Sequence, residues 1–150
     1  MLSQQELSDR FEIQDLCFRY AEIIDSKSFY ALRDEIFTTD AHRDYSAFGG
    51  SVGGLEETIS FLKKAMVEEL FPAHQHLNAN IQVKLAGDTA SGRVMCFNPQ
   101  EISLGDTDTQ LFMIGLWYVD KYVRTDQGWR MSERVEEKSW VFNTPDFMQL

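Results

Sequence analysis

Apolar residues recur at intervals of three and four positions through the first half of the chain. Over residues 13–24 this spacing predicts an amphipathic helix. Ser3 and Glu6, just ahead of it, have the spacing of a capping box, in which the two residues satisfy free backbone amides at a helix start. Apolar stripes at 29–37 and 55–70 predict two more helices. The N-terminal half is therefore expected to be mainly helical.

The second half alternates between apolar and polar positions, as half-buried strands do. Strands are expected at 74–85, 89–104, 110–123 and 129–142, with one earlier strand at 41–48. Glycine- and aspartate-containing turns separate the later strands, and no linker divides the chain. Long antiparallel strands after three helices predict one α+β domain over residues 1–150, with its sheet curled around a helical lid.

The composition is that of a folded domain with an acidic surface. Hydrophobic residues make up 43% of the chain and aromatic residues 13%, which excludes a disordered chain. The formal net charge is -10, from 24 acidic residues against 14 basic ones. Because negative charge repels phosphate backbones and anionic lipids, neither a nucleic acid nor a membrane is expected as a partner.

Targeting and cysteine signals point to a reducing compartment. Residues 1–10 are polar and mixed in charge, unlike a secretory signal. No stretch approaches the roughly 18 apolar residues of a membrane span. Cys17 and Cys96 lie far apart, without metal or redox spacing, and are expected to be small buried hydrophobes. We therefore expect a cytoplasmic protein.

The strand expected at 74–85 carries the most informative polar pattern. Alternation places four polar side chains on one face: His74, His76, Asn78 and Asn80. The opposite face is apolar. Two imidazoles and two amides are costly in an apolar core, so their face either meets solvent or lines a polar pocket. If it lines a pocket, the apolar face needs another cover, for which a neighbouring subunit is a natural candidate.

Three further residues each admit two interpretations. Asp25 stands at the negative end of the first helix dipole, which suits a solvated carboxylate unless a cation or imidazole is near. Tyr20 fits the edge of the helical core stripe or a site. Arg134 alternates with Glu136 on the last strand and fits an exposed ion pair equally well. Local sequence leaves these alternatives open.

Motifs for other chemistry are weak. His74 and His76 could supply two metal ligands, but no third follows at a telling spacing. The glycines of 49–54 lack the strand and lysine of a phosphate-binding loop, and no nucleophile elbow is present. The remaining interpretation is an acid–base site without metal or cofactor.

Several segments, in this order, resemble the SnoaL-like branch of the nuclear transport factor 2-like superfamily: 11–25, 37–41, His76 with Asn80, 87–90, and Trp129 with Arg134 and Trp140. The resemblance covers nearly the whole chain. It implies a cone-shaped α+β fold, a curved mixed or antiparallel sheet around a pocket, and assembly as a trimer or dimer. Scytalone dehydratase, bile-acid 7α-dehydratase and hexachlorocyclohexane dehydrochlorinase share this fold and abstract a proton with a His–Asp pair, without cofactor.

The resemblance also implies roles for individual residues. His76 matches the catalytic base and Asp25 the carboxylate that orients it. Tyr20 matches a tyrosine of the dehydratases, where it would polarise a substrate oxygen or protonate a leaving hydroxyl. Arg134 matches an arginine that would stabilise developing negative charge. A further acid–base residue is expected from the strand after the hairpin, but nothing in 98–101 aligns with one.

The expected function is a cofactor-independent, dehydratase-like lyase for a small apolar carbonyl or hydroxyl compound. An isomerase or a polyketide-type cyclase would use the same dyad, and the same fold could serve as a ligand-binding or partner subunit without catalysis. The residues expected to contact the substrate are Phe11, Phe18, Asn80, Phe112, Ile114, Trp117 and Trp140.

Overall fold

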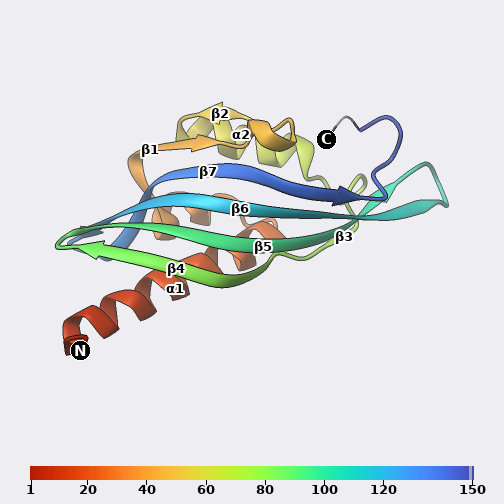
Figure 1. Cartoon of the computed structure of the whole chain (residues 1–150). Coiled ribbons are helices and arrows are strands. Elements are labelled where there is room, and N and C mark those ends of the chain that lie inside the picture. Colours follow the sequence, from red (N-terminus) through yellow and green to blue (C-terminus); the bar gives the residue numbers. More distant parts are fainter. Residues whose placement is uncertain (149) are drawn as a thin grey trace.

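Helix α1 (Gln4–Asp25) lies against one face of a seven-stranded sheet in the computed structural model, which describes residues 1–148 and 150 (Figure 1). The other elements follow in chain order: η1 (Leu32–Ile36), β1 (Phe37–Asp44), η2 (Ser46–Phe48), β2 (Val52–Gly53), α2 (Leu55–Ala65), β3 (Ala73–His74), β4 (Leu77–Ala86), β5 (Thr89–Ser103), β6 (Thr109–Thr125) and β7 (Gly128–Phe142). None of the helices described is long and apolar enough to cross a membrane.

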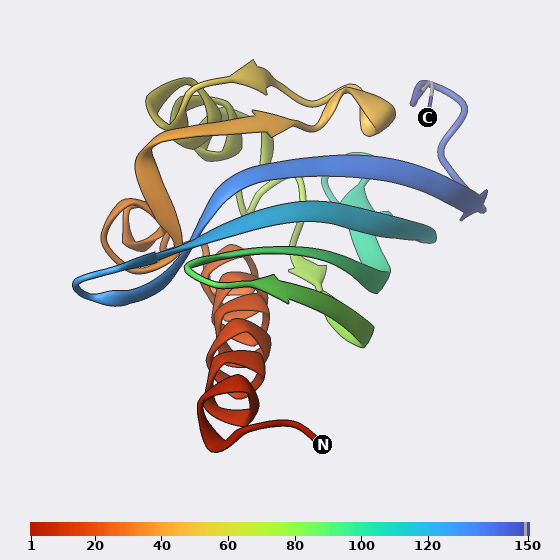
Figure 2. The same ribbon diagram turned by 60° about the vertical axis from the view of Figure 1, so that its left-hand side comes forward.

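The sheet is mixed and strongly curved. Its strand order is β2-β1-β7-β6-β5-β3, and β4 also pairs with β5. Strand β1 runs parallel to β7, and the other pairings are antiparallel. Figure 2 shows β4 to β7 arching over α1. The elements β1, β2 and α2 lie beyond β7, at the opposite edge of the sheet from β4. The expected α+β cone with a curved, mixed sheet is confirmed.

The caps at the two ends of helix α1 place Asp25 next to the sheet. Ser3 and Glu6 form the expected capping box at its first turn. At the other end Lys27 has a φ of 57°, and the Ser28 amide bonds back to the Ile23 carbonyl, which closes the helix. The helix therefore ends at Asp25, and its carboxylate meets the start of the sheet.

Some boundaries differ from the expectation. The second helix is only the π turn η1, and α2 ends at Ala65 rather than at residue 70. Strand β1 starts at Phe37 and ends at Asp44, where 41–48 was expected. It ends early because the Asp44 carboxylate accepts the Ser46 amide and starts the turn η2.

Strand β4 does not keep one alternation along its length. The pairing register with β5 shifts between Ala79 and Gln82, and Asn80 has a φ of 46°. This bulge exchanges the two faces, because an inserted residue turns every later side chain over. Asn78 pairs with buried Cys96 before the bulge, and Leu85 pairs with buried Ala90 after it, so both face inward. The prediction that Asn80 shares a face with the histidines is wrong; its side chain is exposed.

The outer face of the sheet carries an exposed apolar row. Leu77, Phe97, Gly115 and Trp140 lie in register across β4, β5, β6 and β7. The Trp140 ring covers Gly115 so closely that an added Cβ would lie 2.2 Å from the ring, yet the tryptophan is 46% exposed. Exposed patches of this kind mark interaction surfaces. We propose that a second copy of this chain covers the row, because none of its four residues would bring like charges together between two copies of a chain of net charge -10.

Substitution of Trp140 by glutamate is therefore expected to reduce the solution mass from a dimer or trimer to the 17.4 kDa of one chain. Sedimentation equilibrium measures this mass directly. The control is Leu7→Glu, which introduces the same charge at an exposed residue of α1, away from the sheet face, and should leave the assembly unchanged. A wild-type protein that sediments as a monomer contradicts the proposal.

Candidate active site

Two imidazoles share one carboxylate at the junction of α1 with the sheet. Asp25 Oδ1 accepts hydrogen bonds from His76 Nδ1 at 2.6 Å and from His74 Nδ1 at 3.0 Å. Asp25 Oδ2 accepts the His76 backbone amide at 2.9 Å. The imidazoles are well buried, with side-chain exposures of 10% for His76 and 2% for His74, and the carboxylate is 28% exposed.

This arrangement fixes the protonation of the cluster. Burial acts to raise the pKa of Asp25, but the hydrogen bonds from His74 and His76 outweigh it and lower that pKa, so the carboxyl is ionised. A carboxylate can only accept, so each Nδ1 carries the proton it donates. When the His76 ring is neutral, its Nε2 is therefore the unprotonated nitrogen. This is the tautomer required of a base.

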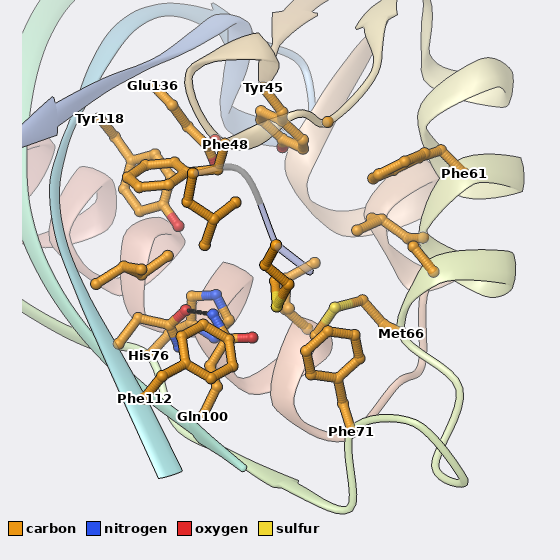
Figure 3. A pocket seen from close by; sticks show the side chains of 18 of the residues that line it. Tyr45, Phe48, Phe61, Met66, Phe71, His76, Gln100, Phe112, Tyr118 and Glu136 are labelled. Atoms are coloured by element: carbon orange, nitrogen blue, oxygen red, sulfur yellow. Dashed lines mark hydrogen bonds between the residues drawn. The ribbon is translucent and has the colours of Figure 1, made fainter. Parts of the chain in front are cut away.

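The two histidines differ in position relative to a cavity of about 240 Å³ (Figure 3). His76 lines it, whereas His74 faces a different, more polar hollow beside Lys27 and Glu101. The walls of the cavity are mostly apolar. They come from α1, η2, α2, the segment between α2 and β3, the sheet and the C-terminal segment: Ile24, Phe48, Phe61, Leu62, Ala65, Met66, Phe71, Phe112, Ile114, Met148 and Leu150. His76 is thus the imidazole that a bound molecule meets.

Two tyrosine hydroxyls meet at the same cavity. Tyr20 and Tyr45 both line it, and their hydroxyl oxygens lie 2.8 Å apart. Burial raises the pKa of Tyr20 to about 12 and that of Tyr45 well above its ordinary value, so both stay neutral. One hydroxyl donates to the other, and the remaining hydrogen can be donated to a ligand oxygen. Sequence analysis selected Tyr20 and missed Tyr45, which follows β1 at an inward position two residues after buried Arg43.

Arg134 lies behind these tyrosines rather than in the cavity. Its guanidinium forms two hydrogen bonds to the Asp120 carboxylate, at 2.8 and 2.7 Å. It also stacks 4.1 Å from the Tyr20 ring centroid and 3.9 Å from that of Tyr118. The pair is fully buried, so the interpretation of Arg134 as an exposed ion pair is wrong. In this position it supports the cavity wall and does not line the cavity.

Of the seven expected substrate contacts, two line the cavity and five do not. Phe112 and Ile114 line the cavity as expected. Other residues of the same prediction lie outside the cavity lining: Phe11, Phe18, Asn80, Trp117 and Trp140. The two phenylalanines occupy the exposed side of α1, and Trp117 faces opposite to inward Leu116 and Tyr118. Trp140 turns outward because the β6–β7 register shifts just before it.

Polar residues that sequence analysis did not assign complete the lining. Asn98 and Gln100 stand where a second acid–base residue was expected, and they bond to each other at 2.5 Å. Their amides are too weak as acids and as bases to transfer a proton in catalysis near neutral pH. Glu136 also lines the cavity, and burial raises its pKa to about 8. Its alternation with Arg134 was the available signal, because it predicts that the two side chains share one face of the strand.

The fold also supplies the third ligand that the sequence lacked for a metal. Ligand atoms of Asp25, His74 and His76 lie within 4.8 Å of one another. Donors bound at about 2.1 Å to a tetrahedral ion stand about 3.4 Å apart. The 2.6 Å from Asp25 Oδ1 to His76 Nδ1 is shorter than that and is a hydrogen-bond distance. The cluster is therefore built as a hydrogen-bonded dyad with a second imidazole.

The sequence matches the SnoaL-like domain over residues 5–135. The chain belongs to the SnoaL-like family. It is 46% identical over 138 residues to Rv2910c of Mycobacterium tuberculosis, an uncharacterized protein, covering 92% of this chain and 90% of that one.

Solved structures of other proteins share the fold. A candidate scytalone dehydratase of Novosphingobium aromaticivorans superposes with a TM-score of 0.82 at 16% identity, over 98% of this chain and 95% of that chain. A hexachlorocyclohexane dehydrochlorinase of Novosphingobium barchaimii superposes with a TM-score of 0.76 at 19% identity, over 96% and 95%. At these identities the likeness establishes the fold, and the chemistry has to be argued from the site.

Proposed function

We propose that this SnoaL-like protein is a cofactor-independent lyase that eliminates water from a small, mostly apolar carbonyl compound. The observation that carries the proposal is the His76–Asp25 pair, in which His76 Nδ1 donates a hydrogen bond to the carboxylate and the imidazole lines a mostly apolar cavity. This geometry leaves Nε2 to take a proton from a bound molecule. Histidine side chains ordinarily titrate near neutral pH, which suits a general base.

The reaction begins at the carbon next to the carbonyl group. His76 Nε2 removes a proton from this carbon, and Asp25 stabilises the imidazolium that forms. The carbonyl oxygen gains negative charge, which a hydrogen bond from the Tyr20–Tyr45 pair stabilises. Departure of a hydroxyl group from the neighbouring carbon then completes the elimination.

The size of the cavity restricts the substrate. Its volume of about 240 Å³ is below the roughly 300–1,000 Å³ of sites for drug-sized ligands. The lining offers few polar groups beside aromatic and aliphatic walls. A single-ring or short-chain molecule carrying a carbonyl and a hydroxyl group fits this description. An isomerisation would begin with the same proton abstraction and differ only in lacking a leaving group.

A panel of small β-hydroxy carbonyl compounds tests the proposal. Compounds that raise the melting temperature are expected to be dehydrated by the wild-type protein, and His76→Ala should lower kcat by about 10²–10⁴. The appearance of the conjugated product in the ultraviolet measures turnover. Phe18→Ala, at an exposed residue of α1 outside the cavity, is the matched control and should keep full activity. Stabilisation by ligands without any turnover would indicate a binding module instead.

A further inference from the structure

Glu136 brings a carboxyl group into the cavity from β7, away from the base. It pairs with Tyr118 across the sheet and alternates with buried Arg134, so its side chain points inward. Figure 3 shows Glu136 beside Tyr45 and Phe48 at one end of the cavity, with His76, Gln100 and Phe112 at the other end. A molecule between these ends contacts an imidazole on one side and a carboxyl group on the other.

The surroundings of Glu136 favour its protonated form. Burial raises the pKa of the carboxyl to about 8, against the attraction of Arg134, whose charge Asp120 already pairs. Within residues 1–148 and 150, the Glu136 side chain has no hydrogen-bond partner that would hold it as a carboxylate. The titratable groups that act on it or face it from the neighbouring elements are Arg134, Asp44, Tyr20, Tyr45, Cys96 and Tyr118.

Other cavity residues are poor proton donors. Tyr20 has a pKa raised by burial to about 12, so its hydroxyl donates a hydrogen bond more readily than a proton. Asn98 and Gln100 carry only amides. A hydroxyl group is a poor leaving group unless it receives a proton as its carbon–oxygen bond breaks. Apart from His76, which takes the carbon-bound proton, Glu136 is the residue of the cavity lining with an acid of suitable strength.

We propose that Glu136 is the second proton-transfer residue of this cavity, and that it protonates the departing oxygen of the substrate. This inference rests on the proposed function. His76 takes the carbon-bound proton, the electron pair of that bond forms the new double bond, and the carbon–oxygen bond breaks. The oxygen leaves with its bonding pair, takes the Glu136 proton and becomes water. The imidazolium then returns its proton through solvent, which restores both residues.

Two substrates with one skeleton and different leaving groups test this role. Glu136→Gln should lower kcat by about 10²–10⁴ for the hydroxy compound, which needs a proton donor. It should change kcat less than about fivefold for the chloro compound, because chloride leaves without a proton. His76→Ala should slow both. Equal losses for the two compounds in Glu136→Gln, or no loss, would overturn the assignment.

A carboxyl titration separates failure of this inference from failure of the proposed function. In ¹³C-labelled protein, the side-chain carboxyl resonance absent from Glu136→Gln should titrate with a midpoint near pH 8. Glu133→Gln, on the same strand and paired with Lys121, is the control and should leave that resonance in place. A midpoint below about 5 overturns the role of Glu136 whether or not a substrate is turned over. If the wild-type protein catalyses no elimination although the midpoint is near pH 8, the result counts against the proposed lyase function.

Discussion

Asp25→Asn should lower kcat by about 10³–10⁴ while the protein remains folded, as loss of the orienting carboxylate does in an analogous catalytic triad. The native carboxylate accepts three hydrogen bonds, two at Oδ1 from His74 and His76 and one at Oδ2 from the His76 amide. An asparagine amide has one oxygen and one NH₂ group, so it cannot accept at both positions.

The consequence falls on the base itself. If the asparagine oxygen keeps the backbone amide, its NH₂ group faces Nδ1 of the imidazoles and favours the tautomer with the proton on Nε2. That tautomer cannot accept a substrate proton. Steady-state kinetics with a confirmed substrate measure the loss, and far-ultraviolet circular dichroism confirms the fold.

His74→Gln is the matched control for Asp25→Asn. It removes one donor to Oδ1 but leaves the 2.6 Å bond from His76 intact, and His74 does not line the cavity. We expect a loss of tenfold or less, because the pair of His76 with Asp25 remains in place. If Asp25→Asn kept turnover within tenfold of the wild type, the carboxylate would have no orienting role.

The second large effect concerns stability. Asp120→Asn should lower the free energy of unfolding by about 3–5 kcal/mol, because it leaves the buried guanidinium of Arg134 without a compensating charge. Tyr122, which donates to the same carboxylate at 2.8 Å, would also lose a charged acceptor. Urea unfolding followed by tryptophan fluorescence measures the change.

A surface pair and a double variant control this experiment. Glu137→Gln breaks the exposed pair with Arg93 and should cost less than about 1 kcal/mol. Replacing both buried partners, with Asp120→Leu and Arg134→Met together, should recover much of the loss, since no unpaired charge is then buried. A change of less than 1 kcal/mol in Asp120→Asn would show that the buried pair does not stabilise the wall behind Tyr20.

The sequence allowed most elements and the contact between Asp25 and His76 to be predicted, for different reasons. Helical and alternating periodicities arise from burial of one face, so α1 and the long strands could be located from them. The choice of Asp25 and His76 came from the family resemblance, because local sequence favoured a solvated carboxylate. The structure brings these side chains together through the end of α1, a long-range contact that spacing along the chain does not encode.

Faces were harder to predict than elements. One bulge at Asn80 and another register shift before Trp140 exchange the faces of β4 and β7, and neither shift has a strong local signal. For the same reason Trp140 was expected in the cavity and lies on the outer sheet face. An ion pair of Arg134 with an acid of another strand was one of the two interpretations, but local sequence did not predict that this acid would be Asp120 or that the pair would be fully buried.

The most direct test of the account is proton exchange in a substrate analogue that lacks the leaving group, so that nothing but proton abstraction is observed. With the wild-type protein in D₂O, the carbon next to the carbonyl group should take up deuterium much faster than in buffer, as read by proton NMR. His76→Ala should exchange at close to the buffer rate. Exchange by His76→Ala as fast as by the wild type, or no enzymatic exchange with an analogue shown to bind, would contradict the assignment of His76 as the base.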